Sequence, residues 1–147
     1  MNISRPIFTT LISIIISSQA HSGVIASCGS SSGYSYYVDN GFIQPESAGF
    51  TDDTITDGVI QLISEPDNEM DIILIDATGQ RLSIVKDGAK LVPLFYGGNI
   101  HVIAVYPAGV VENYTFRVPT NEVTWTKSSY GQLIDKASVF RAKCLFE

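Results

Sequence analysis

The sequence predicts an all-β domain, a single antiparallel meander of about eight or nine short strands that forms a barrel or a sandwich. Val, Ile, Thr, Tyr and Phe, which favour strands, are frequent. Turn residues, mainly Gly, Asp, Asn and Pro, recur at intervals of roughly ten residues. No stretch after the N-terminal segment has a convincing helical period. Because the connections are short, each strand is expected to pair with the next.

The first residues have the three parts of a secretory signal peptide. Arg5 supplies a positive end, residues 7–16 an apolar core, and residues 17–22 a zone of small residues for cleavage. The apolar run is too short to cross a bilayer, and no later run approaches that length. We therefore expect residues 1–22 to be removed. Residues 23–147 would then form one β-domain that is periplasmic or secreted and not membrane-spanning.

Cys28 and Cys144 are the only cysteines, and they lie near the two ends of the predicted domain. We expect a disulfide between them, worth about 4–5 kcal/mol in the chain-entropy model. Residues 25–28, Ile-Ala-Ser-Cys, also resemble a bacterial lipoprotein box, so a lipid anchor on Cys28 is the alternative. The disulfide is favoured because polar residues 17–23 separate this box from the apolar core and because lipidation would leave Cys144 unpaired.

The expected elements follow from alternation and turn signals. Residues 34–38 alternate tyrosine and valine with other side chains and form the first strand, which ends at the Asn-Gly turn of residues 40–41. Residues 42–50 are expected to be irregular and residues 51–58 to be an acidic, turn-rich loop. Residues 128–135 are expected to form a loop with at most one helical turn. The other expected strands are 59–64, 71–76, 81–85, 91–96, 100–106, 110–118, 123–127 and 138–144.

Three of these strands carry more specific expectations. Residues 71–76 place four apolar residues in a row between two acids, so either both faces are covered or one row of side chains packs under a loop. This makes the segment the best candidate for a central strand. Pro93 lacks an N–H and predicts an edge strand. In the strand 110–118, Glu112 lies on the same face as Tyr114 and Phe116, and we expect it to reach water near the strand end. First and last strands are expected to pair or to meet at an edge, which would bring the cysteines together.

The charge of the predicted domain restricts its partners. Residues 23–147 contain 15 acids and 8 bases (one of the nine, Arg5, is in the signal), a net charge of −7. Residues 23–80 hold 10 of the acids and no Lys or Arg. Nucleic acid is not an expected partner, because phosphate binding needs a stripe of basic side chains. Either acidic and basic strands compensate each other, or the first half offers a negative face to a basic partner or a cation.

Few side chains could carry catalysis, so we expect neither an enzyme nor a cofactor. His101 is the only histidine outside the signal and lies in an apolar strand, which favours a structural role. No Gly-x-Ser-x-Gly motif is present, and both cysteines are committed. Asp52, Asp53 and Asp57 could hold calcium, but they lack EF-hand spacing, so a solvated acidic loop and no metal site is expected. A carboxylate-dependent glycoside hydrolase is the enzymatic alternative.

The remaining candidate is the tyrosine-rich stretch that follows Cys28, since tyrosine rings combine apolar area with a polar tip. We predict an exported, non-enzymatic β-domain that binds a protein, with a basic one favoured by the acidic half, or a small ligand. A barrel with an apolar cavity would favour a lipocalin-like carrier of a small apolar ligand. The candidate binding residues are Ser32, Gly33, Tyr34, Tyr36, Tyr37, Asp52, Asp53 and Asp57.

Short motifs carry two resemblances. Ala-Ser-Cys-Gly at 26–29, Asp-x-x-x-x-Asp at 71–76, Val-Tyr-Pro at 105–107 and Ala-Lys-Cys at 142–144 resemble motifs of small exported bacterial proteins of unknown function, which imply no activity. Residues 32–36, Ser-Gly-Tyr-Ser-Tyr, match the Ser-Gly-x-x-Tyr motif of periplasmic lysozyme inhibitors, which are small disulfide-tied β-barrels. That second similarity implies a basic lysozyme as the partner.

Overall fold

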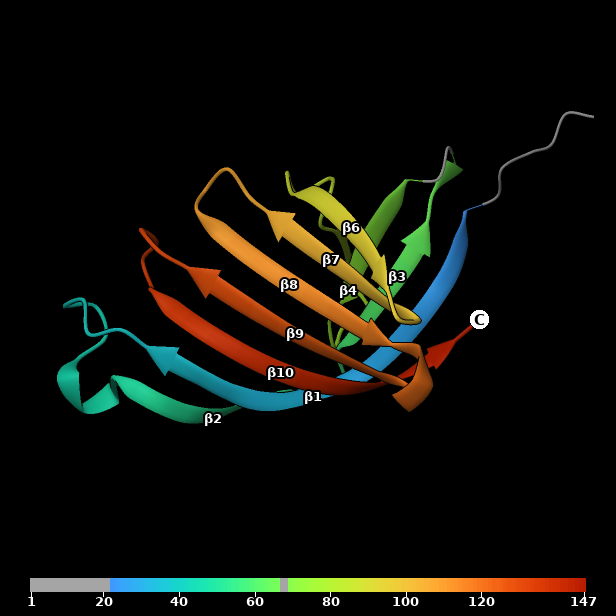
Figure 1. The fold of residues 1–147 in the computed structure, drawn as a ribbon. Helices are drawn as coiled ribbons and strands as arrows, with labels where there is room; N and C mark the ends of the chain where they lie inside the picture. Colours follow the sequence, from blue (N-terminus) through green and yellow to red (C-terminus); the bar gives the residue numbers. More distant parts are fainter. Residues whose placement is uncertain (1–21, 67–68) are drawn as a thin grey trace, which may run out of the picture.

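The computed structural model describes residues 22–66 and 69–147, so the predicted signal peptide lies outside the described residues except for Ser22. Ten strands form a single antiparallel sheet that curls into a half-barrel (Figure 1). The prediction of an all-β meander is therefore confirmed. The strands are β1 (Gly23–Tyr37), β2 (Gly49–Ile55), β3 (Val59–Ser64), β4 (Met70–Ile75), β5 (Arg81–Ser83), β6 (Lys90–Tyr96), β7 (Asn99–Val105), β8 (Val110–Arg117), β9 (Glu122–Ser129) and β10 (Lys136–Phe146). Short 3-10 helices lie at η1 (Pro45–Ser47) and η3 (Val118–Thr120).

The sheet consists of two meanders that meet on β1. The strand order is β5-β4-β3-β1-β10-β9-β8-β7-β6, so most neighbours are consecutive along the chain. β1 pairs along one side with β10, as predicted for the first and last strands. Its other side is shared, because the N-terminal part pairs with β3 and the C-terminal part pairs with β2. β1 is thus the strand on which the sheet branches.

The curled sheet stays open between β5 and β6, which are consecutive in the chain but lie at opposite ends of the strand order. The connection between them is fixed by the buried carboxylate of Asp71 on β4. This carboxylate accepts hydrogen bonds from the Ser83 hydroxyl at 2.5 Å and from the Val85 N–H at 3.3 Å. Ile84, between these two donors, is fully buried. The connection from β5 to β6 therefore contributes the Ile84 side chain to the core, although β5 and β6 are not hydrogen-bonded to each other.

The hydrophobic core lies on one face of the sheet, here called the inner face. Alternate residues of β8, β9 and β10 bury their side chains on it, and a row of aromatic rings crosses the three strands. Ring centroids are 5.9 Å apart between Tyr114 and Trp125 and 4.5 Å apart between Trp125 and Phe140. Such stacked pairs contribute about 0.5–1.5 kcal/mol each beyond the burial of their area. The row ties the second meander to β1, because Phe140 lies directly opposite Gly33.

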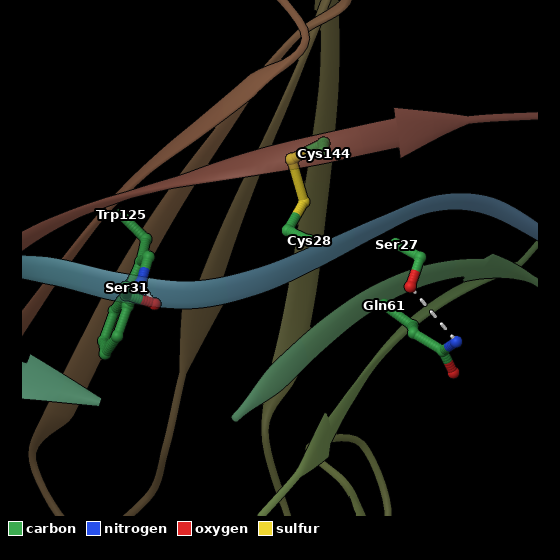
Figure 2. The surroundings of a disulfide bond; sticks show 6 residues. All are labelled: Ser27, Cys28, Ser31, Gln61, Trp125 and Cys144. Atoms are coloured by element: carbon green, nitrogen blue, oxygen red, sulfur yellow. Dashed lines mark hydrogen bonds between the residues drawn. A yellow bond between two sulfur atoms is a disulfide. The ribbon is translucent and has the colours of Figure 1, made fainter. Parts of the chain in front are cut away.

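The predicted disulfide is present between Cys28 on β1 and Cys144 on β10 (Figure 2). The two residues lie directly opposite each other in the ladder, with Cα atoms 3.9 Å apart, and both are buried. The bond uses the Cys28 sulfur that a lipid anchor would need, so the lipid-anchor alternative receives no support. A register shift follows between Cys28 and Ser31, and beyond it the tyrosine-rich part of β1 begins.

Three elements differ from the sequence-based expectations. Residues 49–55, expected to be irregular or a loop, form the strand β2 because the tyrosine-rich part of β1 offers them a pairing edge. The first strand begins at Gly23 and spans 15 residues, far more than residues 34–38. β4 has the expected cover over neighbouring Ile72 and Ile73, yet it is next to the last strand of the sheet and not central. The edge position predicted for the strand of Pro93 is confirmed.

Candidate functional site

The predicted binding residues do not form one site, because alternation along β1 and β2 sends them to opposite faces. Tyr34 lies directly opposite Asp52, and Tyr36 directly opposite Phe50. These side chains, together with Ser32, point away from the core, to what is here called the outer face. Gly33 and Asp53, which also oppose each other, belong to the inner face. Asp57 lies in the turn after β2 with a positive φ of 58°.

The outer face carries an exposed aromatic patch, defined here as Tyr34, Tyr36, Phe50 and Val139. Tyr36 and Phe50 are in contact, with ring centroids 4.9 Å apart. All four side chains are solvent-exposed, and Phe50 is 82 % exposed. They line an open hollow of about 490 Å³ whose lining is almost wholly apolar. This outer aromatic patch has the amphipathic rings and the concavity that protein interfaces use.

Phe50 is the member of the patch that sequence reasoning missed, because residues 42–50 were expected to be irregular. A period of two does run through this segment, with Phe50, Asp52 and Thr54 on the outer face. The sequence does not reveal this period, because polar residues occupy both faces of the segment and no apolar row marks one of them. Only the pairing with β1 reveals which side chains share a face.

The three candidate acids do not converge. Asp52 points outward beside Tyr34, whereas Asp53 points inward and accepts a hydrogen bond from the Ser35 hydroxyl at 2.7 Å. The backbone N–H of Asp57 donates to the Ser30 hydroxyl at 3.0 Å. Across the described ranges 22–66 and 69–147, no three His, Cys, Asp or Glu side chains are grouped to hold a metal ion. The acids of β2 thus present single charges on separate faces.

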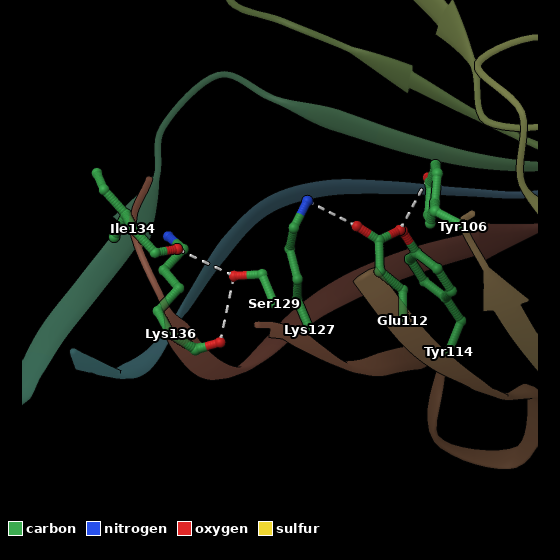
Figure 3. Close-up of polar contacts among 7 residues, drawn as sticks. All are labelled: Tyr106, Glu112, Tyr114, Lys127, Ser129, Ile134 and Lys136. Carbon is green, nitrogen blue, oxygen red and sulfur yellow. Dashed lines mark hydrogen bonds and ion pairs between the residues drawn. The ribbon is translucent and has the colours of Figure 1, made fainter. Parts of the chain in front are cut away.

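The inner face contains a buried polar cluster centred on Glu112 (Figure 3). The sequence pattern predicts that Glu112 reaches water, but its side chain is only 2 % exposed. Its carboxylate forms an ion pair with Lys127 at 2.8 Å and accepts hydrogen bonds from the hydroxyls of Tyr114 at 2.7 Å and Tyr106 at 3.3 Å. The expectation was wrong because the curvature of the sheet and the ring of Tyr106 cover this end of β8.

The phenols of this cluster are held in their protonated state. Burial raises the pKa of Tyr114 and of Tyr106 well above the ordinary value of 10, and the neighbouring Glu112 charge raises both further. Each phenol therefore remains a hydrogen-bond donor to the carboxylate at neutral pH. Every buried side-chain nitrogen and oxygen in the described part of the chain has a partner. The geometry of the cluster is that of a satisfied core network.

A groove runs along the inner face past this cluster. Two hollows of about 320 and 500 Å³ share Leu74, Glu112 and Lys127 in their walls. Trp125 and Phe140 add aromatic rings to the first hollow. Because a carboxylate and an ammonium group lie in both walls, the groove differs from the enclosed apolar cavity that a lipocalin-like carrier would need. The carrier alternative therefore receives less support than a surface-binding function.

Two of the predicted binding residues have local structural roles. A Cβ atom at Gly33 would lie 1.9 Å from the backbone oxygen of Val139, so only glycine allows β1 and β10 to approach this closely. The Tyr37 ring lies under the Lys136 ammonium, which is 5.4 Å from the ring centroid. Both contacts give these residues a role in packing β1 against β10 that requires no ligand.

The single histidine of the predicted domain also has a structural contact. His101 pairs through Nδ1 with the Thr115 hydroxyl, at 3.1 Å, on the neighbouring strand.

Comparison of the chain with protein-family models, with curated proteins and with solved structures finds no match. In the described part of the chain, no helix has the length and the apolar character needed to cross a membrane. The candidate site for binding is the outer aromatic patch.

Proposed function

We propose that this protein is an exported, non-catalytic binding domain and that the outer aromatic patch docks a partner protein. The observation that carries the proposal is the contact on the outer face between Tyr36 of β1 and Phe50 of the edge strand β2, with Phe50 82 % exposed. Large contiguous apolar patches are uncommon on monomers and typically mark interaction sites. Aromatic side chains also supply most of the binding energy in many interfaces.

The compartment is inferred from two features. The Cys28–Cys144 disulfide supports an oxidising environment, because reducing compartments keep such thiols apart. The signal-like residues 1–22 support secretion or a periplasmic location. Together they favour a partner that is itself outside the cytoplasm.

The charge around the patch favours a basic partner. Asp52 belongs to the same outer face and lies directly opposite Tyr34, with no base across the ladder. The three ion pairs of the described residues join Lys127 to Glu112 and Arg141 and Lys143 to Glu122, all within residues 81–147. The described acids of residues 23–66 and 69–80 therefore form no ion pair, and their field attracts basic proteins.

The test is a comparison of two aromatic substitutions that are matched in exposure. Phe50 and Tyr96 are both 82 % exposed and lie on different edge strands, β2 beside β1 and β6 at one end of the strand order. The wild-type protein, Phe50→Ser and Tyr96→Ser are purified after export by expressing cells, immobilised and exposed to periplasmic extract and to host fluids. We expect a partner that wild type and Tyr96→Ser retain and that Phe50→Ser loses.

Retention of the same proteins by Phe50→Ser and wild type would refute docking through the patch. A thermal unfolding curve of each variant checks that the fold is intact. Because Phe50 is almost fully exposed, its replacement should change the free energy of unfolding by less than about 0.5 kcal/mol.

Inhibition of a lysozyme is the second candidate function. It is favoured by the outward orientation of Tyr36, the tyrosine of the Ser-Gly-x-x-Tyr stretch, on the same face as Asp52. A lysis assay with a basic lysozyme should then show inhibition that Tyr36→Ala weakens about tenfold or more, whereas Tyr130→Ala, also at an exposed tyrosine, has no effect. Full lysozyme activity in the presence of excess wild-type protein would remove this candidate and leave docking of another partner standing.

A further inference from the structure

The edges of the sheet are protected to different degrees. β5 and β6 end the strand order, and β2 pairs only with β1 among the described residues. β5 is 3 residues long, which leaves little edge to pair with. β6 carries Lys90 and Pro93, and both residue types discourage the addition of another strand.

β2 has neither the short length of β5 nor the lysine and proline of β6, and its two aspartates protect it only against strands without a complementary charge. It spans 7 residues, Gly-Phe-Thr-Asp-Asp-Thr-Ile, with no proline, lysine or arginine. Its outer side holds the Phe50 ring of the aromatic patch and the Asp52 carboxylate, and its inner side holds Asp53. A free strand edge presents unpaired backbone N–H and C=O groups that can bind an extended segment of another chain.

We propose that β2 binds an extended, basic segment of the partner as an additional antiparallel strand. The inference rests on the proposed docking function and specifies its mode. Charge decides the occupant: β2 carries two adjacent acids, and its ladder neighbour β1 contains no Lys or Arg. Lys127 and Lys136 line the same inner hollow as Asp53, so the unopposed charge is that of Asp52 on the outer face. Lys or Arg opposite each acid supplies the complementary charge, and the strand adds main-chain hydrogen bonds that the aromatic patch alone does not.

A second copy of this chain is a poorer occupant. Asp52 is the middle residue of β2, so full antiparallel pairing of two β2 strands places one Asp52 opposite the other. Like charges directly opposite each other destabilise a ladder, and the adjacent Asp53 of each copy adds to the repulsion. The edge is thus selective against its own copy and for a basic strand.

The ladder geometry predicts a recognition pattern. In an added antiparallel strand, the residues opposite Asp53, Asp52, Thr51 and Phe50 follow one another in chain order. Side chains directly opposite share a face, so the first basic residue meets Asp53 on the inner face and the second meets Asp52 on the outer face. Two positions later, an apolar residue meets Phe50. The pattern is basic, basic, any residue, apolar.

The test uses synthetic ten-residue peptides made of Thr and Val around a Lys-Arg-Thr-Phe core, with a Glu-Glu-Thr-Phe peptide as the charge control. Binding to the exported protein is measured by fluorescence anisotropy. We expect the basic peptide to bind at least about tenfold more tightly than the acidic one. The protein variant with Asp52→Asn and Asp53→Asn should lose this preference, whereas Glu69→Gln, an acid in the turn before β4, should keep it.

Two further measurements separate strand addition from binding by charge alone. Two N-methylated versions of the basic peptide are made, one at the odd and one at the even peptide nitrogens, so that each lacks the N–H donors on one side of the strand. Only the version that lacks the donors facing β2 should fail to bind. Hydrogen exchange of the β2 amides should slow when the basic peptide is bound. Equal binding of both N-methylated versions, or unchanged exchange of the β2 amides, would overturn strand addition.

These outcomes are distinct from a failure of the docking function. If the peptides do not bind while Phe50→Ser still loses the natural partner, strand addition is wrong and the docking function stands. If Phe50→Ser retains the partner, the docking function is wrong whatever the peptides do. A peptide-free dimer with slowed exchange at β2 would show that a second copy is the occupant and would overturn the basic-strand proposal.

Discussion

Glu112 lies directly opposite Lys127 in the ladder between β8 and β9, and its carboxylate forms an ion pair with the Lys127 ammonium at 2.8 Å. The Glu112 side chain is only 2 % exposed. Removing a carboxylate from water is costly, and the cost is offset only when its oxygens have close partners. Here the ammonium of Lys127 and the phenols of Tyr106 and Tyr114 provide them. The cluster is therefore sensitive to the loss of any one member.

Substitution of Glu112 by alanine should lower the free energy of unfolding by about 2–4 kcal/mol, because two buried phenols lose their acceptor and a cavity forms. Lys127→Met should cost a similar amount, about 2–4 kcal/mol, because it leaves the buried Glu112 carboxylate without its paired ammonium, although the phenols still donate to that carboxylate. Urea unfolding of both variants measures the two losses. A loss below about 1 kcal/mol for Lys127→Met would contradict this account of the cluster.

Gly33→Ala should destabilise the protein by about 2–4 kcal/mol, since the added methyl group meets backbone atoms of β10 that cannot move independently. Gly29→Ala is the matched control on the same strand, because a Cβ atom at Gly29 has nothing within 4 Å. Its effect should stay within about 0.5 kcal/mol of wild type. Thermal or urea unfolding measures both, and equal effects would show that β1 and β10 are not held at the close approach described above.

Removal of the disulfide by Cys28→Ala together with Cys144→Ala should lower the free energy of unfolding by about 2–5 kcal/mol. The expected effect is at the upper end because the bond joins residues 116 positions apart in the chain. The double variant should keep the same far-UV spectrum under native conditions. Mass spectrometry of a digest of the unreduced wild type supplies the direct check, and a digest without a linked Cys28–Cys144 peptide would refute the bond.

The outward-facing Glu122 should make stability fall in acid. Hydrogen bonds and charge from Lys143 and Arg141 lower the pKa of Glu122 from 4.5 to about 2 in the folded state. A lowered carboxyl pKa contributes stability that is fully present above pH 4.5, the pKa of the unfolded chain, and is lost as the pH falls toward about 2. Thermal midpoints of wild type and Glu122→Gln should therefore converge between these two values. A constant gap across this range would mean that the pairing does not stabilise the folded state.

The elements that the sequence predicts well are those in which a local pattern and the tertiary fold agree. Tyr114 and Phe116 alternate with polar residues in β8 and are buried on one face. Pro93 cannot donate to a ladder and lies on an edge strand. The two cysteines had no other partner, and they are bonded. In each case a local feature, namely the alternation, the missing N–H or the cysteine pair, permits very few positions in the sheet.

The elements that escaped prediction depend on contacts with distant parts of the chain. β2 contains two aspartates and two threonines, and it becomes a strand because β1 lies beside it. The burial of Glu112 depends on Lys127 and on Tyr106 from the preceding turn, whose positions follow from the curvature of the sheet. Neither relationship has a signature in the local sequence.

The candidate site was predicted in part. The tyrosine-rich stretch does contribute Tyr34 and Tyr36 to the exposed patch, but Phe50 was missed with the strand that carries it. Gly33 and Tyr37 were grouped with the binding residues because they are close in sequence. Alternation sends them to the other face, where they serve the packing of β1 against β10.

The pairing of β1 with β10 also means that the sheet is complete only when the two ends of the described chain meet. β1 can pair with β2 and β3, which follow it closely in sequence, yet its other side has no partner until the 11 residues of β10 dock. The second meander, from β6 to β10, can assemble from neighbouring strands in the meantime. We therefore expect a partly folded chain to carry an open edge on β1, and a chaperone that binds extended segments would bind there.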